Sequence, residues 1–171
     1  HVRREGAMNC IISSDNMDVE KLKLELAKVP SMGGLELASV VSTTESYYLG
    51  NPESEIRVAV LDFGVKKNIL NCLVERGVYV KVHNAKTSFE ELQEFKPNGY
   101  FISNGPGDPE PMDYAVKTVK QILAAEKPLF GICLGHQLLA LANDIPTFKM
   151  HHGHRGLNHP VKNLISGKSE I

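Results

Sequence analysis

The stretch Pro128-Leu129-Phe130-Gly131-Ile132-Cys133-Leu134-Gly135-His136-Gln137 predicts both the local fold and the chemistry of this chain. It begins as a short apolar run and reaches a cysteine with one glycine two positions away on each side. The apolar residues 138–142 that follow predict a helix. A strand that turns abruptly into a helix at a nucleophile is the pattern of the G-x-S-x-G nucleophile elbow. Here the nucleophile would be a thiol.

The glycines of this elbow have a physical reason. Because Gly131 and Gly135 carry no Cβ, the strand and the helix can approach closely around residue 133. The turn would place the Cys133 sulfur at the helix N-terminus, where unpaired N–H groups and the helix dipole favour a thiolate. The alternative is a buried structural cysteine, a common role for a single cysteine. The strand-to-helix context favours the nucleophile.

The composition is that of a globular protein. A chain of 171 residues suits one domain with a partial second unit, and 42% hydrophobic content excludes a disordered chain. The net charge is −1 and no basic run exceeds two residues, so no nucleic acid partner is expected. No membrane span and no signal peptide are expected either. Three scattered cysteines, Cys10, Cys72 and Cys133, predict no disulfide framework and suit a reducing cytoplasm.

Residues 1–54 are expected to stand apart from the rest of the chain. Residues 10–13 could form an edge strand, and Asp15 or Asn16 could cap a helix that ends at Pro30. Residues 35–41 predict a second short helix, and residues 43–55 a linker. We therefore place a domain boundary near residue 55.

After this boundary, predicted strands and helices alternate. Strands are expected at 57–61, 78–82, 100–103 and 128–132, and helices at 66–76, 87–95 and about 115–123. Thr87-Ser88-Phe89-Glu90 matches a capping box for the second of these helices. Residues 146–150 could form another strand, and 161–171 carry a weak strand signal. The alternation predicts an α/β fold, a parallel sheet with helices on both faces.

In such a sheet, ligands bind at the edge where the carboxyl ends of the strands meet. Loops 62–65 and 104–109 and the Cys133 elbow would all lie there. Loop 104–109 contains two glycines and two prolines, which suits an oxyanion hole or a substrate clamp, although it could be an ordinary connection. The four histidines at 151, 152, 154 and 159 could suggest a metal site. No Cys or carboxylate stands nearby at ligand spacing, so a polar loop is favoured and no metal is expected.

Four segments together resemble a known family. Residues 131–137 are similar to the nucleophile motif of class I, triad-type glutamine amidotransferases. Segments 61–70, 103–109 and 153–160 narrow the resemblance to the glutamine-hydrolysing small subunits of carbamoyl-phosphate synthases. The resemblance implies a flavodoxin-like fold for an amidotransferase domain at 55–171. Residues 1–54 would then be the C-terminal part of a smaller N-terminal domain, with its linker.

The resemblance also implies roles for individual residues. Cys133 would attack the carboxamide carbon of L-glutamine, form a glutamyl thioester and release ammonia. Leu134 and Gly107 would supply oxyanion N–H groups, while Gly105 and Gln137 would contact glutamine. No cofactor is expected in this chain. In a cytoplasmic heterodimer, the large subunit would use ATP and metal ions to make carbamoyl phosphate for pyrimidine and arginine synthesis.

The chain departs from the family at the catalytic base. The family has a His-x-Glu pair, whereas here Val161 stands two positions after His159, where the glutamate would be. The resemblance places the triad His and Glu beyond Ile171. This chain is therefore expected to have the nucleophile without its base and to hydrolyse glutamine poorly by itself. It is also expected to expose apolar surface and to self-associate.

Three other interpretations remain open. The chain could be another amidotransferase domain, such as that of anthranilate or GMP synthesis, although segments 62–68 and 153–156 argue against it. It could be a non-catalytic module that keeps only the fold. It could also be a redox-sensing flavodoxin-like protein that uses Cys133 without glutamine.

Overall fold

The computed structural model describes residues 2–154 and 158–171 and divides the chain into two compact units. The larger unit is Met32–Thr147, and the smaller combines His1–Ser31 with Phe148–Ile171. None of the described helices is long and apolar enough to cross a membrane.

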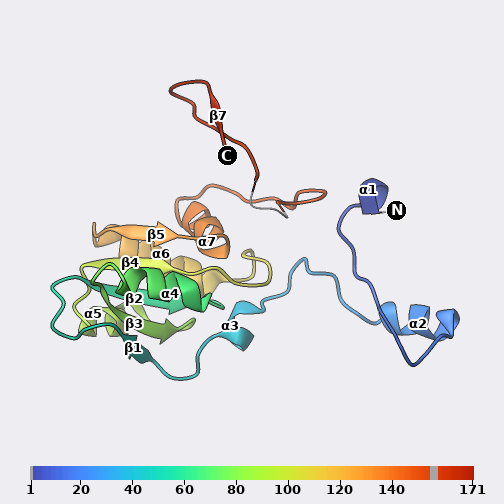
Figure 1. The fold of residues 1–171 in the computed structure, drawn as a ribbon, viewed down its shortest axis with the longest axis horizontal. Helices are drawn as coiled ribbons and strands as arrows, with labels where there is room; N and C mark the ends of the chain where they lie inside the picture. Colours follow the sequence, from blue (N-terminus) through green and yellow to red (C-terminus); the bar gives the residue numbers. More distant parts are fainter. Residues whose placement is uncertain (1, 155–157) are drawn as a thin grey trace. The chain divides into compact units, whose positions relative to one another are not determined.

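The larger unit is built on a five-stranded sheet with the spatial order β1-β3-β2-β4-β5 (Figure 1). The strands are β1 (Tyr47–Leu49), β2 (Arg57–Asp62), β3 (Tyr79–Asn84), β4 (Gly99–Ile102) and β5 (Leu129–Gly131). Strands β2 to β5 run parallel, and β1 pairs antiparallel with β3 at the edge. The parallel strands follow the 2-1-3-4 order of a flavodoxin-like sheet, in which the chain reverses its winding direction between β2 and β4.

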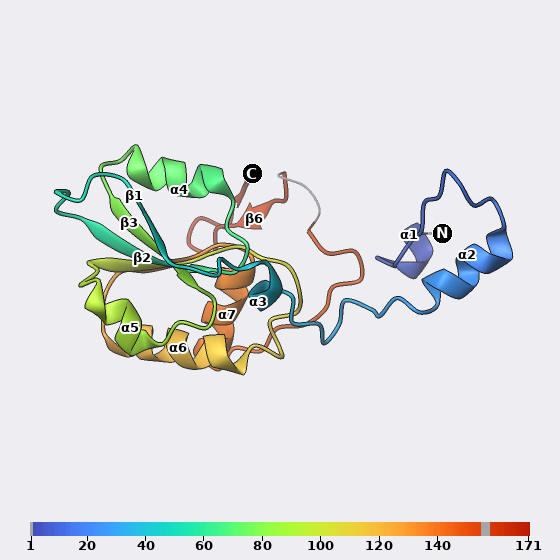
Figure 2. The ribbon, with the colours of Figure 1, turned by 90° about the horizontal axis from the view of Figure 1, so that it is seen from below.

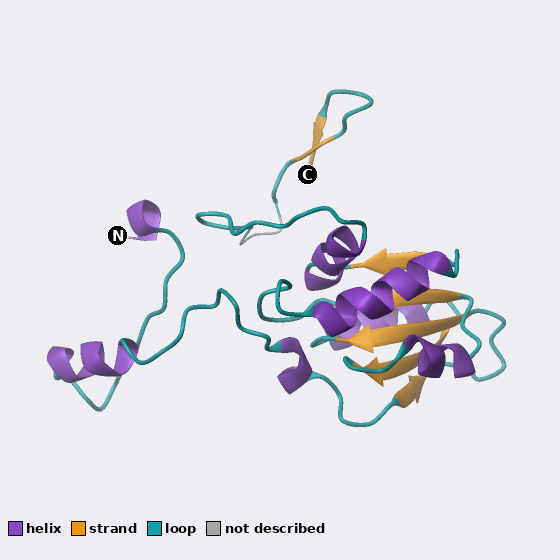
Figure 3. Cartoon of the chain, turned by 180° about the vertical axis from the view of Figure 1, so that it is seen from behind, coloured by secondary structure: helices purple, strands orange, loops and turns teal. Residues whose placement is uncertain are grey.

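The larger unit has five helices; α3 precedes β1, and from β2 onward each strand is followed by a helix, so that helices cover both faces of the sheet. They are α3 (Ala38–Val41), α4 (Lys67–Val74), α5 (Phe89–Glu94), α6 (Asp113–Ala124) and α7 (Leu134–Ala142). Figure 2 shows α4 on one side of the sheet and α5 and α6 on the other. The purple helices of Figure 3 lie in front of and behind the orange strands.

Each face of the sheet has its own apolar core, because successive side chains of a strand point to opposite faces. Leu61 and Ile102 belong to the core under α5, α6 and α7. Val60 and Phe101, the neighbours of these residues in the same strands, belong to the core under α4. The central strands β2 and β4 therefore contain continuous apolar runs, as expected for a parallel sheet covered on both sides.

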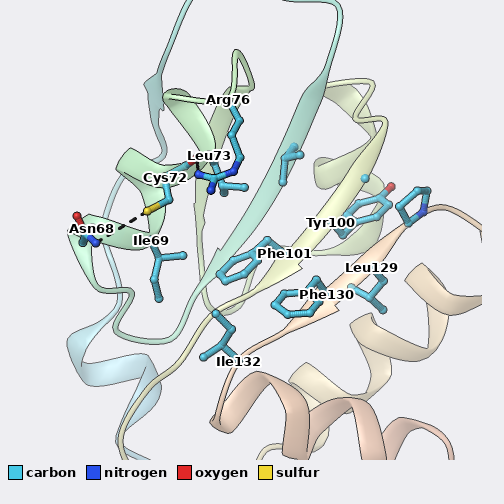
Figure 4. Close-up of a pocket in the computed structure, with 13 residues that line it drawn as sticks. Asn68, Ile69, Cys72, Leu73, Arg76, Tyr100, Phe101, Leu129, Phe130 and Ile132 are labelled. Atoms are coloured by element: carbon cyan, nitrogen blue, oxygen red, sulfur yellow. Dashed lines mark hydrogen bonds between the residues drawn. The ribbon is translucent and has the colours of Figure 1, made fainter. Parts of the chain in front are cut away.

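The face under α4 is covered only in part. A groove of about 560 Å³ remains between α4 and the β4–β5 half of the sheet (Figure 4). We call it the α4–β5 groove; its lining includes Ile69, Cys72, Arg76, Phe101, Phe130 and Ile132. Phe130 is 63% exposed there, although it lies in a strand.

The described residues of the smaller unit form little regular structure. It contains α1 (Val2–Glu5), α2 (Val19–Leu26) and the antiparallel pair β6 (Val161–Lys162) and β7 (Ser169–Glu170). The Asp18 carboxylate caps α2 by accepting the N–H groups of Glu20 and Lys21. The expected helix is thus confirmed, but its cap is Asp18 and not Asp15 or Asn16.

The α/β fold class and the alternating elements after residue 57 are confirmed. Three local predictions are wrong. Residues 10–13 and 146–150 form no strand, and the expected linker 43–55 contains β1. Two exposed tyrosines begin β1, so no alternation marks it, and its pairing with β3 is a tertiary contact. The domain boundary near residue 55 stays a prediction.

Candidate functional site

The elbow forms as the sequence predicts. Strand β5 ends at Gly131 and α7 begins at Leu134, so the chain reverses within two residues. Cys133 caps the helix with φ 53° and ψ −109°, a backbone conformation that L residues rarely adopt. Strain of this kind is typical of functional sites, where the surrounding structure holds it in place. The cysteine is exposed and free.

Both glycines of the elbow lie where a side chain would not fit. A Cβ on Gly131 would lie 2.7 Å from the backbone carbonyl of Gly135. A Cβ on Gly135 would overlap the carbonyl oxygen of Ile102. The Gly135 N–H donates to the Ser103 carbonyl at 3.1 Å, which ties α7 to the end of β4. The glycines therefore allow the close approach on which the elbow depends.

Leu134 and Gln137 have different environments. The Leu134 side chain is buried in the core, while its N–H belongs to the first turn of α7 and has no helical acceptor. Gln137 lies one turn further on, and its N–H donates to the Cys133 carbonyl at 3.1 Å. Its side chain is exposed, and the spacing of four residues places it on the same helix face as Cys133.

The loops after β2 and β4 are bound to each other at the carboxyl edge of the sheet. The Phe63 N–H donates to Ser103 Oγ at 2.9 Å. The Asn104 amide donates to the Gly64 carbonyl at 2.9 Å and accepts the Lys66 N–H at 3.3 Å. These strands flank the point where the winding reverses, the usual ligand site of open α/β sheets.

The Asp62 carboxylate, at the end of β2, holds the backbone of the loop that follows this strand. Asp62 is 5% exposed, and its carboxylate accepts the N–H groups of Thr43, Gly64 and Val65, each at 2.8 Å. Buried charge is tolerated only when it is fully hydrogen-bonded. Asp62 therefore fixes the loop backbone.

Gly105 and Gly107 are packed against two different segments. A Cβ on Gly105 would overlap the Phe63 carbonyl oxygen. Gly107 has φ +99°, and a Cβ there would lie 2.7 Å from the Leu35 carbonyl oxygen and 2.9 Å from the Leu37 nitrogen. We call residues 33–39 the strap. Its Leu35 carbonyl accepts the Asp108 N–H at 2.9 Å, and the Gly34 N–H donates to Asp108 Oδ2 at 2.9 Å.

Glu36 is the carboxylate of the strap itself. Its carboxylate accepts the Ser39 N–H at 2.9 Å, the Ser39 hydroxyl and the Tyr114 hydroxyl at 3.1 Å. Burial raises the pKa of Glu36, but these hydrogen bonds and the nearby charge of Lys86 outweigh it, so the net pKa is lowered. Burial, followed by the charge of Glu36, raises the pKa of Tyr114. Glu36 is therefore an ionised acceptor.

Four histidines of the smaller unit contact one another in pairs. The rings of His151 and His152 are 4.4 Å apart, and those of His154 and His159 are 4.6 Å apart. Within the described ranges, no three His, Cys, Asp or Glu side chains are grouped so that they could hold a metal ion. Residues 155–157 of the segment 153–160 lie outside the described residues.

The structure thus brings the Cys133 elbow, the Gly105–Gly107 loop and the 62–65 loop to one sheet edge. Sequence reasoning missed the parts that hold them: Asp62, Ser103 and the strap. Asp62 had a readable signal, because a carboxylate directly after a buried strand needs partners. The strap had none, since it contacts Asp108 from 70 or more residues away in the chain.

Comparison with known proteins gives a consistent result. Residues 59–170 match the family model of glutamine amidotransferase class-I. A carbamoyl phosphate synthase small chain from Chlorobaculum tepidum is 46% identical over 172 residues, which cover 99% of this chain. Proteins of the same name from Pseudomonas syringae and Salmonella typhimurium are 48% and 47% identical over 97% and 95% of it. The chain spans about half the length of these relatives, 47%, 48% and 47% respectively.

Proposed function

The chain belongs to the class-I glutamine amidotransferase family, and on this premise we propose that it is part of a carbamoyl phosphate synthase small chain. Such a protein would hydrolyse glutamine and deliver ammonia to a synthetase partner. The strained, exposed Cys133 on its strand-to-helix turn is the observation that carries the proposal. The relatives that share 46–48% of the sequence over most of the chain point to this member of the family.

The reaction would proceed through a covalent intermediate. The Cys133 thiolate attacks the carboxamide carbon of glutamine, and the C–N bond breaks as ammonia leaves with an added proton. A glutamyl thioester remains, and water hydrolyses it to glutamate and the free thiol. The base that takes the thiol proton would be the His of the family's His-x-Glu pair, which does not occur within residues 1–171.

Four further residues would position glutamine. The N–H groups of Leu134 and Gly107 would stabilise the oxyanion that forms during attack. Support comes from the Leu134 N–H, which begins α7 and needs a non-helical acceptor. Gly105 would contact the substrate from the loop that packs against the Phe63 backbone. Gln137 would contact it from the face of α7 that also carries Cys133.

The partner would be the large synthetase subunit, which would use ATP and metal ions to make carbamoyl phosphate for pyrimidine and arginine synthesis. We propose a heterodimer in the cytoplasm, where free thiols persist; Cys10, Cys72 and Cys133 are all unpaired. A non-catalytic module and a redox-sensing protein are the alternatives that the following experiment separates.

Covalent labelling tests the proposed nucleophile. A diazoketone analogue of glutamine should alkylate Cys133, and an excess of glutamine should slow this labelling at least tenfold. Cys10 is also exposed and provides an internal control, because glutamine should not protect it from iodoacetamide. Peptide mass spectrometry would locate both adducts. Labelling of Cys133 without protection by glutamine would favour a redox role and contradict the proposal.

Catalysis is tested on the protein expressed from its complete native reading frame. We expect Cys133→Ala to abolish glutamine hydrolysis, and residues 1–171 alone to hydrolyse glutamine poorly because they lack the base. Glutamate release measures both. Hydrolysis by the substituted protein at the unsubstituted rate would exclude the Cys133 mechanism.

A further inference from the structure

The strap lies outside the region that matches the family model, yet it contacts the proposed oxyanion loop directly. The match begins at residue 59, whereas the strap comprises residues 33–39. Its backbone abuts Gly107 so closely that no Cβ would fit between them. Two hydrogen bonds, Asp108 N–H to the Leu35 carbonyl and Gly34 N–H to the Asp108 carboxylate, fix the next peptide of the loop.

The strap is itself tied to the core at two points. Ala38 is fully buried in the core under α5, α6 and α7. The Glu36 carboxylate accepts the Tyr114 hydroxyl at 3.1 Å, and Tyr114 stands in the first turn of α6. These contacts form a closed ring. The chain runs from Asp108 to Tyr114 in α6, the Tyr114 hydroxyl donates to Glu36, and the strap that contains Glu36 returns to Asp108 through its two hydrogen bonds.

The hydrogen bonds of this ring are of a kind that holds the strap rigidly against the loop. An ionised acceptor makes stronger hydrogen bonds than a neutral one, and Glu36 receives three of them. The Lys86 ammonium lies 5.9 Å from the Tyr114 ring centre and adds a favourable charge nearby. Glu36, Tyr114 and Asp108, which make the hydrogen bonds of the ring, are not among the residues assigned to bond-making or to glutamine contact.

We propose that Glu36 and Tyr114 are positioning residues that act through the strap to orient the Gly107 N–H for oxyanion stabilisation. The inference rests on the proposed function, because it needs glutamine hydrolysis at Cys133. An oxyanion donor is effective only when it is held in the right direction before the charge develops. Loosening the ring should therefore slow the chemical step and leave glutamine binding nearly unchanged.

The test uses the protein expressed from its complete native reading frame, assayed for glutamine hydrolysis. Tyr114→Phe removes one hydroxyl from the ring without changing the packing volume of α6. We expect kcat to fall about five- to tenfold, less than the roughly 100-fold or greater loss of an oxyanion donor, with KM changed less than about twofold. Glu36→Ala should do at least as much, and Glu36→Gln, which keeps an acceptor, should recover part of the loss.

Tyr100→Phe is the matched control. The Tyr100 hydroxyl is buried but has no hydrogen-bond partner among the residues that the structure describes, so its removal should leave kcat unchanged. Hydrogen exchange of residues 104–110 gives a second readout that does not depend on activity, and it should be faster in Tyr114→Phe than in the control.

The outcomes separate the two proposals. If the unsubstituted protein shows no hydrolysis that depends on Cys133, the proposed function fails and this inference fails with it. If the unsubstituted protein is active but Tyr114→Phe matches Tyr100→Phe in kcat, the strap has no positioning role. Unchanged hydrogen exchange at 104–110 would overturn the inference whatever the activity.

Discussion

At the scale of single residues, some buried polar side chains hold the loops of the site in place, whereas burial of another makes the fold less stable at low pH. Asp62 and Ser103 are buried and fully engaged in holding the loops of the site. His83 on β3 is only 2% exposed, and within the described part of the chain its Nε2 has no hydrogen-bond partner. Burial, reinforced by the charge of Lys81 and opposed by that of Glu91, lowers the pKa of His83 to about 4. The folded protein therefore keeps this imidazole neutral.

His83 should make stability depend on pH. The unfolded chain takes up the His83 proton near pH 6.5 and the folded chain only near pH 4, so protonation favours unfolding. The free energy of unfolding is therefore highest above about pH 6.5. As the pH falls towards 4, it should decrease by up to about 3 kcal/mol because of His83. Urea unfolding at several pH values would measure it. His83→Leu should flatten this part of the profile, and an unchanged slope would contradict the assignment to His83.

Gly135 should tolerate no side chain. In Gly135→Ala the new Cβ would overlap the Ile102 carbonyl oxygen, so α7 must move away from β4. We expect a loss of about 3 kcal/mol in the free energy of unfolding, the cost of overpacking against backbone. His136→Ala, at an exposed position on the same turn, is the control and should change stability little. Equal losses of stability in the two variants would mean that the close approach of Gly135 to the Ile102 carbonyl does not require a glycine.

At the scale of elements, α5 shows how local signals decide a helix start. The sequence matched a capping box at Thr87-Ser88-Phe89-Glu90, but the box forms one residue later. The Ser88 hydroxyl accepts the Glu91 N–H at 3.3 Å, and the Glu91 carboxylate accepts the Ser88 N–H at 2.9 Å. Both frames place a glutamate three residues after a hydroxyl, so only the structure distinguishes them.

A pair of alanine substitutions tests the frame of this box. Ser88→Ala removes the cap and should lower the free energy of unfolding by about 1 kcal/mol. Thr87→Ala leaves both bonds of the box intact and should cost much less. Urea denaturation of the two variants decides between the two boxes. A larger loss of unfolding free energy in Thr87→Ala would support the box predicted from the sequence, Thr87 to Glu90, and contradict the observed one.

At the scale of the whole molecule, the α4–β5 groove is an apolar surface that the larger unit leaves open. Phe130 is 63% exposed in it, beside Phe101 at a ring separation of 6.2 Å. Apolar surface of this kind commonly marks a contact site. This agrees with the sequence-based expectation that the chain self-associates, which stays a prediction.

Replacing Phe130 should weaken that association. Burial of an exposed phenylalanine contributes about 1.5–3 kcal/mol, so Phe130→Ser should raise the dissociation constant at least about tenfold. Sedimentation or light scattering of residues 1–171 over a concentration series would measure it. Phe148→Ser removes an 85% exposed phenylalanine outside the groove and is the control. If both substitutions weaken association equally, the groove is not the contact.

The sequence by itself determined the features that depend on neighbouring residues. Apolar runs, helix periodicity and the G-x-C-x-G spacing predict the alternating elements from β2 to α7 and the Cys133 elbow, because each is encoded within about fifteen residues. Only the tertiary structure decided what depends on distant contacts: β1 at the sheet edge, the Thr43 N–H that Asp62 accepts and the strap against Gly107. Such contacts join residues whose separation along the chain leaves no periodic signal, so they become visible only when the sheet brings its loops to one edge.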